Sequence, residues 1–238
     1  MWKFTNFTSK YYKLFNYSDQ KMKTKFKGII FDIDGTLTFT NQLIFDSFNY
    51  IAEKYLNKKF SVEEIIALFG PTEDVILKQM FPDKFEEVRK DYYNYYHQNH
   101  NIALLYDGIK ELLIDLKNSG VILGIFTGKG RTSSLITLNF LGIRELFDMI
   151  VTGDDVKNHK PSPEGIIKFI ETFRLKPEEV LMVGDAPSDI KAAKQAGVQI
   201  ASVVWDSYSA DEVRKLNKET VFETVEGLRK FIFEKDAV

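Results

Sequence analysis

The chain has 238 residues, of which 44% are hydrophobic and 28% charged, and its formal net charge is −2. This composition is typical of a globular protein and excludes a disordered, collagen-like or coiled-coil chain. Because there is no basic excess, we expect no nucleic-acid partner. The absence of cysteine excludes disulfides and thiolate metal sites. No apolar run approaches the ~20 residues of a membrane-spanning helix, so we expect no membrane partner.

The first 26 residues are predicted to form an N-terminal extension. They are rich in lysine and aromatic residues. Lys3, Lys10 and Lys13 interrupt every candidate for the apolar part of a secretory signal, and we therefore expect a cytoplasmic protein. Met22 begins a short leader into the first predicted strand. It is an alternative start, which would place residues 1–21 upstream of the true one.

Beyond this extension the pattern changes to that of an α/β protein. Residues 28–31 form a short apolar run that ends at Asp32, as expected of a buried parallel strand. Residues 40–100 then carry helical patterns without an intervening strand, with a capping box at Ser61 and a helix stop at Gly70-Pro71. This stretch is predicted to be an all-helical insertion after the first strand.

Strands and helices alternate along most of the remaining chain. The predicted strands cover residues 121–126, 148–152, 180–185 and 200–205, and the predicted helices cover about 109–120, 131–141, 163–173 and 187–195. Such alternation with short loops predicts a doubly wound, Rossmann-like parallel sheet. We expect an α/β core made of residues 27–39 and 101–238, with the helical residues 40–100 inserted into it.

Polar residues follow four of the predicted strands. They are Asp32 and Asp34 after the first strand, Thr127 and Gly128 after the second, Lys160 beyond the third, and Asp185 and Asp189 after the fourth. Ligands of open parallel sheets bind beyond the carboxyl ends of the strands, so these side chains should converge on one crevice. Capping of strands and helices explains any one of them, but not why all four sets lie at one edge.

The acids at this edge suit phosphoryl transfer. Asp32 and Asp34 lie two residues apart, so on an extended chain they face the same side. Such a pair can divide into a nucleophile and a general acid/base. Asp32 and Asp185 together offer hard oxygen ligands from separate strands, which suit Mg²⁺ better than zinc. A magnesium-dependent reaction is therefore expected.

The remaining residues at this edge suit the binding of phosphate. Thr127 and the Gly128 N–H lie at a predicted helix N-terminus, which is a natural phosphate site. Lys160 adds the cation that phosphate oxygens require. Asp189, four residues after Asp185, could support Lys160 or a metal-bound water.

Four ordered segments resemble the motifs of the haloacid dehalogenase superfamily. They are FDIDGTLT (31–38), FTGK (126–129), Lys160 in HKPSPEG, and GDAPSDI (184–190). Within the superfamily, residues 35–48, 69–77, 152–165 and 202–209 resemble the phosphoglycolate phosphatase-like branch and its relative, an inorganic pyrophosphatase. Phe39, Gly165 and Asp206 depart from the pattern of this branch, which puts the substrate in question and not the chemistry.

The resemblance implies a role for each matching residue. Asp32 would be the nucleophile that becomes an aspartyl phosphate, and Asp34 would be the acid/base. Mg²⁺ would be held by the Asp32 side chain, the Asp34 backbone carbonyl and Asp185. Thr127 and Lys160 would hold the phosphoryl oxygens, while the last motif aspartate supports the lysine and the metal shell.

The helical insertion matches the small cap of the family, which closes over the substrate and excludes bulk water. In relatives the loop at residues 70–73 faces the core site, so Thr72 and Glu73 are candidate specificity residues, with Glu73 the stronger. Lys129, at a predicted helix start, is most simply interpreted as solvent-exposed. Surface or packing roles are expected for three other candidates in the cap, Arg89, His97 and His100.

The leading hypothesis is a Mg²⁺-dependent phosphatase of a small phosphorylated metabolite, similar to phosphoglycolate phosphatase. Inorganic pyrophosphatase is the alternative. A sugar-phosphate mutase is less favoured, because residues 38–55 contain no histidine. A non-catalytic binding protein would be expected to have lost Asp32, Asp34 or Lys160. The sequence does not rank the substrates, and it leaves a monomer and a dimer equally open.

Overall fold

The structure is a computed structural model that describes residues 22–233. Residues 1–21 of the expected extension lie outside the described residues. The last residues of this extension contact the core. Thr24 forms a bridge with Phe233, and the ring of Phe26 is buried against Phe231.

The core is a six-stranded sheet in the order β5-β4-β1-β6-β7-β8, and all of its neighbouring strands are parallel. The strands are β1 (Gly28–Phe31), β4 (Ile122–Phe126), β5 (Met149–Val151), β6 (Val180–Gly184), β7 (Gln199–Val203) and β8 (Val221–Phe222). The chain adds β4 and β5 on one side of β1 and then adds β6, β7 and β8 on its other side. The direction in which strands are added therefore reverses at β1. This doubly wound arrangement confirms the predicted fold class.

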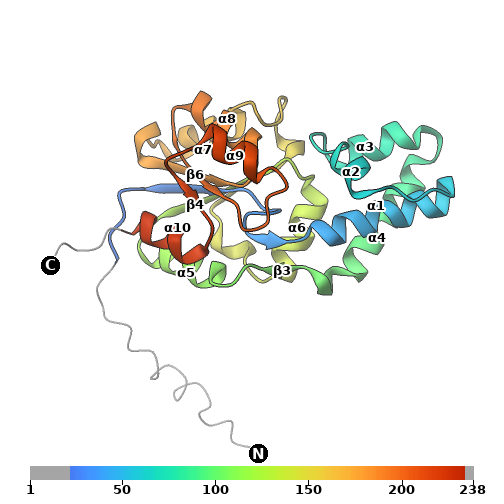
Figure 1. The fold of residues 1–238 in the computed structure, drawn as a ribbon, viewed down its shortest axis with the longest axis horizontal. Coiled ribbons are helices and arrows are strands. Elements are labelled where there is room, and N and C mark those ends of the chain that lie inside the picture. Colours follow the sequence, from blue (N-terminus) through green and yellow to red (C-terminus); the bar gives the residue numbers. More distant parts are fainter. Residues whose placement is uncertain (1–21, 234–238) are drawn as a thin grey trace, which may run out of the picture.

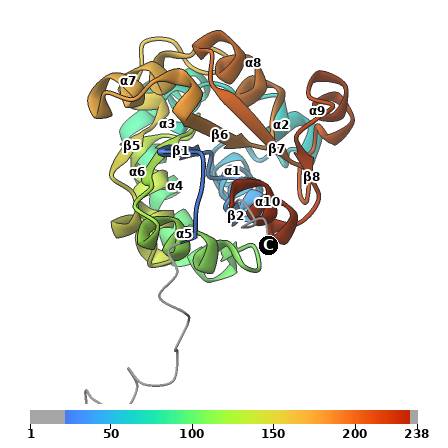
Figure 2. The ribbon, with the colours of Figure 1, turned by 90° about the vertical axis from the view of Figure 1, so that its left-hand side faces the viewer.

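Helices cover both faces of the sheet (Figure 2). Successive residues of a strand point to opposite faces. Ile29 and Phe31 therefore pack in the cluster that contains α5 (Ile109–Asn118) and α10 (Val225–Ile232), whereas Ile30 packs in the cluster that contains α7 (Glu164–Phe173) and α8 (Pro187–Ala196). The remaining core helices are α6 (Arg131–Phe140) and α9 (Ala210–Leu216).

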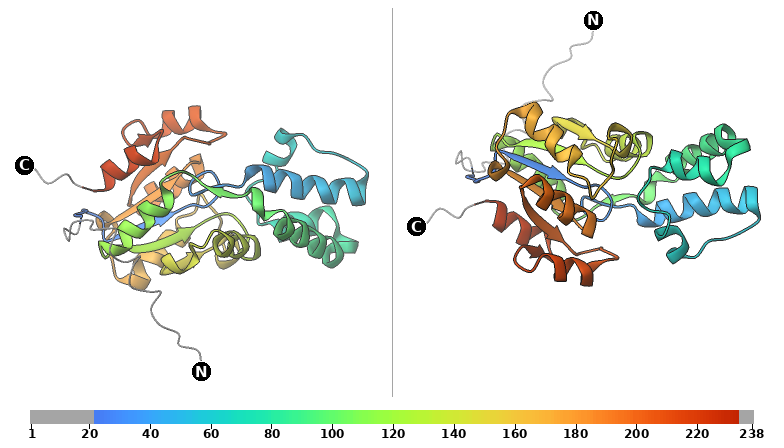
Figure 3. Two further views of the ribbon diagram at one scale, coloured as in Figure 1. Left: turned by 90° about the horizontal axis from the view of Figure 1, so that it is seen from below. Right: turned by 90° about the horizontal axis from the view of Figure 1, so that it is seen from above.

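A helical unit projects from one end of the core (Figures 1 and 3). It contains α1 (Asn41–Leu56), α2 (Val62–Ile66), α3 (Glu73–Met80) and α4 (Phe85–Gln98). These helices enclose an apolar cluster of their own, in which Phe48 of α1 packs against Tyr92 of α4 at 5.1 Å between ring centroids. The segment that enters this unit and the segment that leaves it form two short antiparallel strands, β2 (Thr38–Phe39) and β3 (Leu104–Leu105).

Local signals predicted some helix starts better than others. Ser61 forms the expected capping box, because its Oγ accepts from the N–H of Glu64 and its own N–H donates to the Glu64 carboxylate. Thr40 and Thr72 occupy N-cap positions without capping their helices. Within residues 22–233, none of the helices is long and apolar enough to cross a membrane.

Candidate active site

The three central strands end beside one another and present the predicted polar residues. Phe31 of β1 lies opposite Ile125 of β4 and Val183 of β6, so the residues that follow these strands meet at one edge. Asp32 follows β1, Thr127 follows β4 and Asp185 follows β6. The topology thus explains why residues about 150 positions apart share one site.

Lys160 joins two of the motif carboxylates. Its Nζ lies 3.0 Å from Asp32 Oδ2 and 2.6 Å from Asp189 Oδ1. The side chains of Lys160 and Asp189 are almost fully buried. Burial alone would lower the pKa of the Lys160 ammonium, but the charges of Asp189 and Asp32 raise it above its ordinary value. The charged form of Lys160 is thus favoured by two carboxylates, and the contact of Asp189 with Lys160 is one of the two roles that the sequence suggested for this residue.

The carboxylates at this edge form a set that fits a divalent cation. One oxygen from each of Asp32, Asp185 and Asp189 lies within 4.8 Å of the others. Burial raises the pKa of Asp32 to about 6 despite Lys160, and burial followed by the charge of Asp32 raises the pKa of Asp185. A cation between these hard oxygens would reverse both shifts, and oxygen ligands of this kind suit Mg²⁺. The buried donor set thus fits the expected metal.

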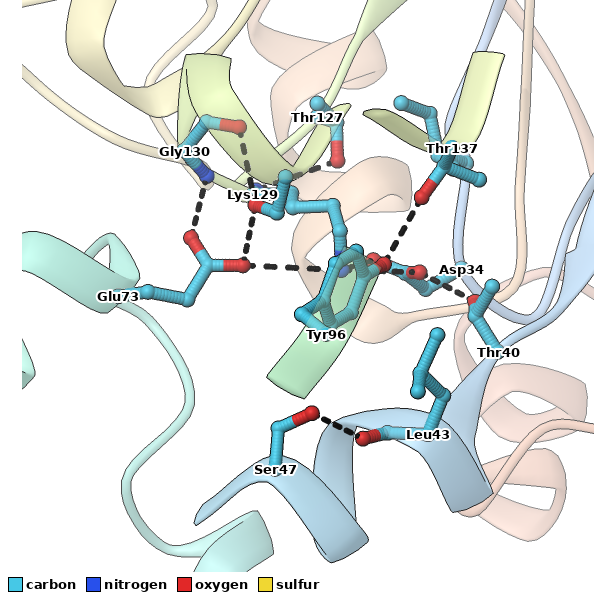
Figure 4. A network of polar contacts seen from close by, with 12 residues as sticks. Asp34, Thr40, Leu43, Ser47, Glu73, Tyr96, Thr127, Lys129, Gly130 and Thr137 are labelled. Atoms are coloured by element: carbon cyan, nitrogen blue, oxygen red, sulfur yellow. Dashed lines mark hydrogen bonds and ion pairs between the residues drawn. The ribbon is translucent and has the colours of Figure 1, made fainter. Parts of the chain in front are cut away.

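Asp34 lies outside that cluster and is held by other partners (Figure 4). Its Oδ1 accepts from the hydroxyl of Thr40 at the start of α1, and its Oδ2 lies 3.2 Å from Lys129 Nζ. Its side chain is 21% exposed, more than that of Asp32. The two paired acids therefore have different surroundings, as a division between nucleophile and acid/base requires.

The interpretation of Lys129 as an exposed residue is wrong. Its side chain is only 2% exposed and lies between the carboxylates of Asp34 and Glu73, at 3.2 and 3.6 Å. Burial would lower its pKa, but the charges of Asp34 and Glu73 and a contact with the Tyr96 hydroxyl raise it. Two carboxylates thus compensate for the loss of hydration that would otherwise keep a lysine at the surface.

Thr127 and Gly128 line the same cavity as the acids. Thr127 is buried, and its Oγ1 accepts the backbone N–H of Lys129 at 3.2 Å. Gly128 lies between β4 and α6, whose first residue is Arg131. The turn before a helix N-terminus is where a phosphate is favoured, and a phosphate-binding role for both residues remains a prediction.

The cavity has a volume of about 250 Å³ and lies between the core and the helical unit. Its core side is lined by the motif residues Asp32, Asp34, Thr127, Gly128, Lys129, Lys160 and Asp185, with Ser207 and Tyr208 nearby. Its other side is largely apolar and is formed by Ile44, Phe48, Ile66, Phe69, Pro71 and Ile76. The cavity thus combines a charged floor with an apolar roof.

The two candidate specificity residues differ in position. Glu73 lines the cavity, but its carboxylate is occupied by the core, accepting from Gly130 N at 2.7 Å and from Ser133 Oγ at 2.6 Å. Thr72 is buried outside the lining residues, and its Oγ1 has no hydrogen-bond partner among residues 22–233. A specificity role for these residues remains a prediction.

Sequence reasoning missed Ser133, Ser207 and Tyr208, although the match of residues 202–209 to the phosphatase branch is a signal that points to the last two. His100 is buried between the rings of Tyr96 and Phe140, which confirms its packing role.

Comparison with known proteins bears directly on this geometry. The sequence model of a family described as haloacid dehalogenase-like hydrolase matches residues 29–203. Pyrophosphatase PpaX of Halalkalibacterium halodurans is 35% identical over 201 residues, covering 84% of this chain and 94% of the relative. Pyrophosphatase PpaX of Bacillus cereus strain B4264 is 36% identical over 178 residues, covering 74% of this chain and 82% of the relative.

Solved structures agree with this relationship. The crystal structure of a protein described as a predicted phosphoglycolate phosphatase, from Haemophilus somnus 129PT, has a TM-score of 0.78 and 27% identity. The similarity covers 87% of this chain and 98% of that one. The resemblance expected from the four motifs is confirmed, and the chain belongs to the haloacid dehalogenase-like hydrolases, within their phosphatase branch.

Proposed function

We propose that the protein is a Mg²⁺-dependent phosphatase that hydrolyses a small phosphorylated metabolite through an aspartyl phosphate on Asp32. The observation that carries this proposal is the convergence of Asp32, Lys160, Asp185 and Thr127 beneath the helical cap, at the bottom of one cavity. A cation, a hydroxyl and a nucleophilic carboxylate are the groups that phosphoryl transfer needs. Mg²⁺ would be held by Asp32, the Asp34 carbonyl and Asp185, and would neutralise charge on the transferring phosphoryl group.

In the first step, a carboxylate oxygen of Asp32 forms a bond to phosphorus as the bond to the leaving oxygen breaks. Lys160 orients the Asp32 oxygen 3.0 Å away and, with Thr127, binds phosphoryl oxygens. Asp34 gives its proton to the leaving oxygen. The apolar roof of the cavity keeps bulk water from the reacting atoms.

In the second step, water attacks the phosphorus of the aspartyl phosphate. Asp34, now ionised, takes the proton of this water, and the bond between phosphorus and the Asp32 oxygen breaks. Phosphate leaves and Asp32 returns as a carboxylate. Asp34 thus acts first as an acid and then as a base, and its contacts with Thr40 and Lys129 support a fixed orientation during both steps.

Two substrates have separate support. The name of the Haemophilus somnus protein supports phosphoglycolate, and the names of the PpaX relatives support inorganic pyrophosphate. A mutase is the third candidate, since it would start with the same transfer to Asp32. A cytoplasmic location also remains part of the proposal.

The test is phosphate release from phosphoglycolate, pyrophosphate, sugar phosphates and nucleoside monophosphates, each with Mg²⁺ and with chelator. The proposal expects Mg²⁺-dependent release from at least one of them. Return of the phosphoryl group to a sugar without release would instead favour the mutase. Absence of both reactions, with the protein folded, would reject the proposed activity.

A further inference from the structure

The cap contacts the core through a segment that fits closely against two core glycines. A Cβ on Gly153 would lie 2.4 Å from Thr72 Cγ2, and a Cβ on Gly130 would lie 2.7 Å from Glu73 Oε2. Neither glycine has the positive φ that would itself require glycine. A Cβ on Gly153 would also lie 2.6 Å from the core carbonyl oxygen of Gly128, so both glycines stand where cap and core atoms crowd together. The cap thus lies directly against the core in this structure, in a closed position.

Glu73 is the charged residue of this contact. It begins α3 of the cap, and its side chain is 7% exposed. Its carboxylate accepts from the Gly130 N–H and the Ser133 hydroxyl, and it lies 3.6 Å from Lys129 Nζ. All three partners belong to the core. A buried carboxylate is costly without partners, so opening the cap would end every one of these contacts and expose Glu73 to water.

Lys129 receives partners from both sides of this contact (Figure 4). From the core it contacts Asp34 at 3.2 Å. From the cap it contacts Glu73, and its Nζ lies 5.0 Å from the ring centroid of Tyr96 on α4. The hydroxyl of Tyr96 in turn is 2.8 Å from that of Thr137 on α6. The position of the ammonium thus depends on cap residues as well as on Asp34.

We propose that Lys129 is a positioning residue that couples cap closure to the orientation of Asp34, with Glu73 as the latch on the cap. With the cap closed, Glu73 and Tyr96 hold the ammonium in place, and the ammonium holds the carboxyl of Asp34 where it faces the cavity. When the cap lifts, Lys129 loses both cap partners and Asp34 loses its fixed neighbour. Exclusion of water and alignment of the acid/base then occur in one movement.

This inference rests on the proposed acid/base role of Asp34, and it changes the role expected of Glu73. A specificity residue acts on the shape or charge of the leaving group. A latch acts through Lys129 on the protonation of the leaving oxygen. The two roles differ in their dependence on leaving-group acidity, which two aryl phosphates of similar size can measure.

The kinetic test compares phenyl phosphate with p-nitrophenyl phosphate in Lys129→Met and Glu73→Gln. Phenol has a pKa of about 10, like tyrosine, and p-nitrophenol is more acidic. Only the departure of phenol therefore depends strongly on protonation of the leaving oxygen by Asp34. In Lys129→Met we expect kcat/KM to fall about tenfold more for phenyl phosphate than for p-nitrophenyl phosphate. In Glu73→Gln we also expect the larger loss of kcat/KM for phenyl phosphate. Lys59→Met and Glu86→Gln, which change exposed cap residues, are the matched controls.

Equal losses on both aryl phosphates in Lys129→Met would reduce Lys129 to a structural residue and overturn the proposal. A loss in Glu73→Gln that spares both aryl phosphates, but affects phosphoglycolate or pyrophosphate, would return Glu73 to specificity and also overturn the latch.

A second measurement does not depend on activity. Because the chain has no cysteine, spin labels can be placed at Lys78→Cys on α3 and Glu171→Cys on α7, both exposed. Pulsed electron resonance should show the short, closed distance as the main population, and a severalfold smaller closed fraction in Glu73→Gln. Gly130→Ala should have the same effect, because its Cβ displaces the Glu73 carboxylate.

An unchanged closed fraction in both latch variants would overturn the proposal even if the protein is an active phosphatase. Conversely, a failure of the proposed function would appear as absent phosphate release in the unmodified protein, while these distances still report the latch. The two failures are therefore distinguishable.

Discussion

Replacement of Lys160 by methionine would remove the cation from a cluster of buried carboxylates. Lys160 Nζ contacts Asp32 at 3.0 Å and Asp189 at 2.6 Å, and these two carboxylate side chains are 12% and 0% exposed. Methionine fills much of the same space with a flexible apolar chain. The substitution therefore tests the charge of Lys160 more than its volume.

The expected loss of stability follows from the partners that remain. Removing one member of a buried ion pair costs about 3–5 kcal/mol. Asp32 still accepts the Ile33 N–H at 2.8 Å and Asp189 still accepts the Ala186 N–H at 3.0 Å. Because each carboxylate keeps a backbone donor, we expect the lower end, about 3 kcal/mol, at pH 8 without Mg²⁺.

The sign of the pH dependence is fixed by Asp32. Burial already raises its pKa to about 6 against the opposing charge of Lys160, and loss of that charge raises it further. A carboxyl group with a raised pKa in the folded state is less destabilising at low pH, where it is protonated, and its cost appears as pH rises through the folded pKa. The deficit of Lys160→Met should therefore be full at pH 8 and should shrink towards pH 5.

Urea unfolding followed by circular dichroism, in chelator at both pH values, measures this deficit. The matched control is Lys230→Met, which breaks a surface pair with Glu226 in which both side chains are 62% exposed; we expect it to change stability by less than about 0.5 kcal/mol. A deficit in Lys160→Met no larger than that of the control, or one that grows as pH falls, would refute the reasoning.

Three further predictions follow from the same structure. Asp34→Asn should slow hydrolysis of the aspartyl phosphate, so that intact-protein mass spectrometry detects an added phosphoryl group; unchanged turnover would argue against its acid/base role. Phosphate release should stop in chelator, return with Mg²⁺ and be inhibited by Ca²⁺, which prefers looser coordination; full activity after verified metal removal would exclude a metal requirement. Burial lowers the pKa of His100 to about 4, so its contribution to the free energy of unfolding should be lost as pH falls from about 6.5 to 4. In His100→Phe that part of the decline should be absent from urea unfolding, and parallel profiles for the two proteins would show that the pKa of His100 is the same in the folded and the unfolded state.

The core site could be predicted because its geometry follows from topology. Once strands are recognised and known to be parallel, the residues after β1, β4 and β6 must lie at one edge of the sheet. The order of the four motifs then placed Asp32, Thr127, Lys160 and Asp185 together without any knowledge of their distances. Short or irregular segments carried weaker signals, and β2, β3, β8, α9 and α10 were not anticipated.

The contacts between cap and core could not be predicted in this way. Glu73 of the cap contacts Lys129 of the core, and it also contacts Gly130 and Ser133, which lie 57 and 60 positions away. These contacts depend on how one unit rests on another, which no local periodicity encodes. The pattern around Lys129 indicated only a helix start, and so a buried, doubly paired lysine was interpreted as a solvated one.

The most direct test of the proposed mechanism is to identify the residue that carries the phosphoryl group during turnover. The protein would be mixed with Mg²⁺ and its best phosphorylated substrate, quenched with acid within a single turnover, digested and mapped by mass spectrometry. We predict a phosphoryl group on Asp32, and neither phosphoenzyme nor turnover in a folded Asp32→Asn variant. Rapid turnover with no phosphoryl group on the protein, or with that group on another residue, would contradict nucleophilic catalysis by Asp32.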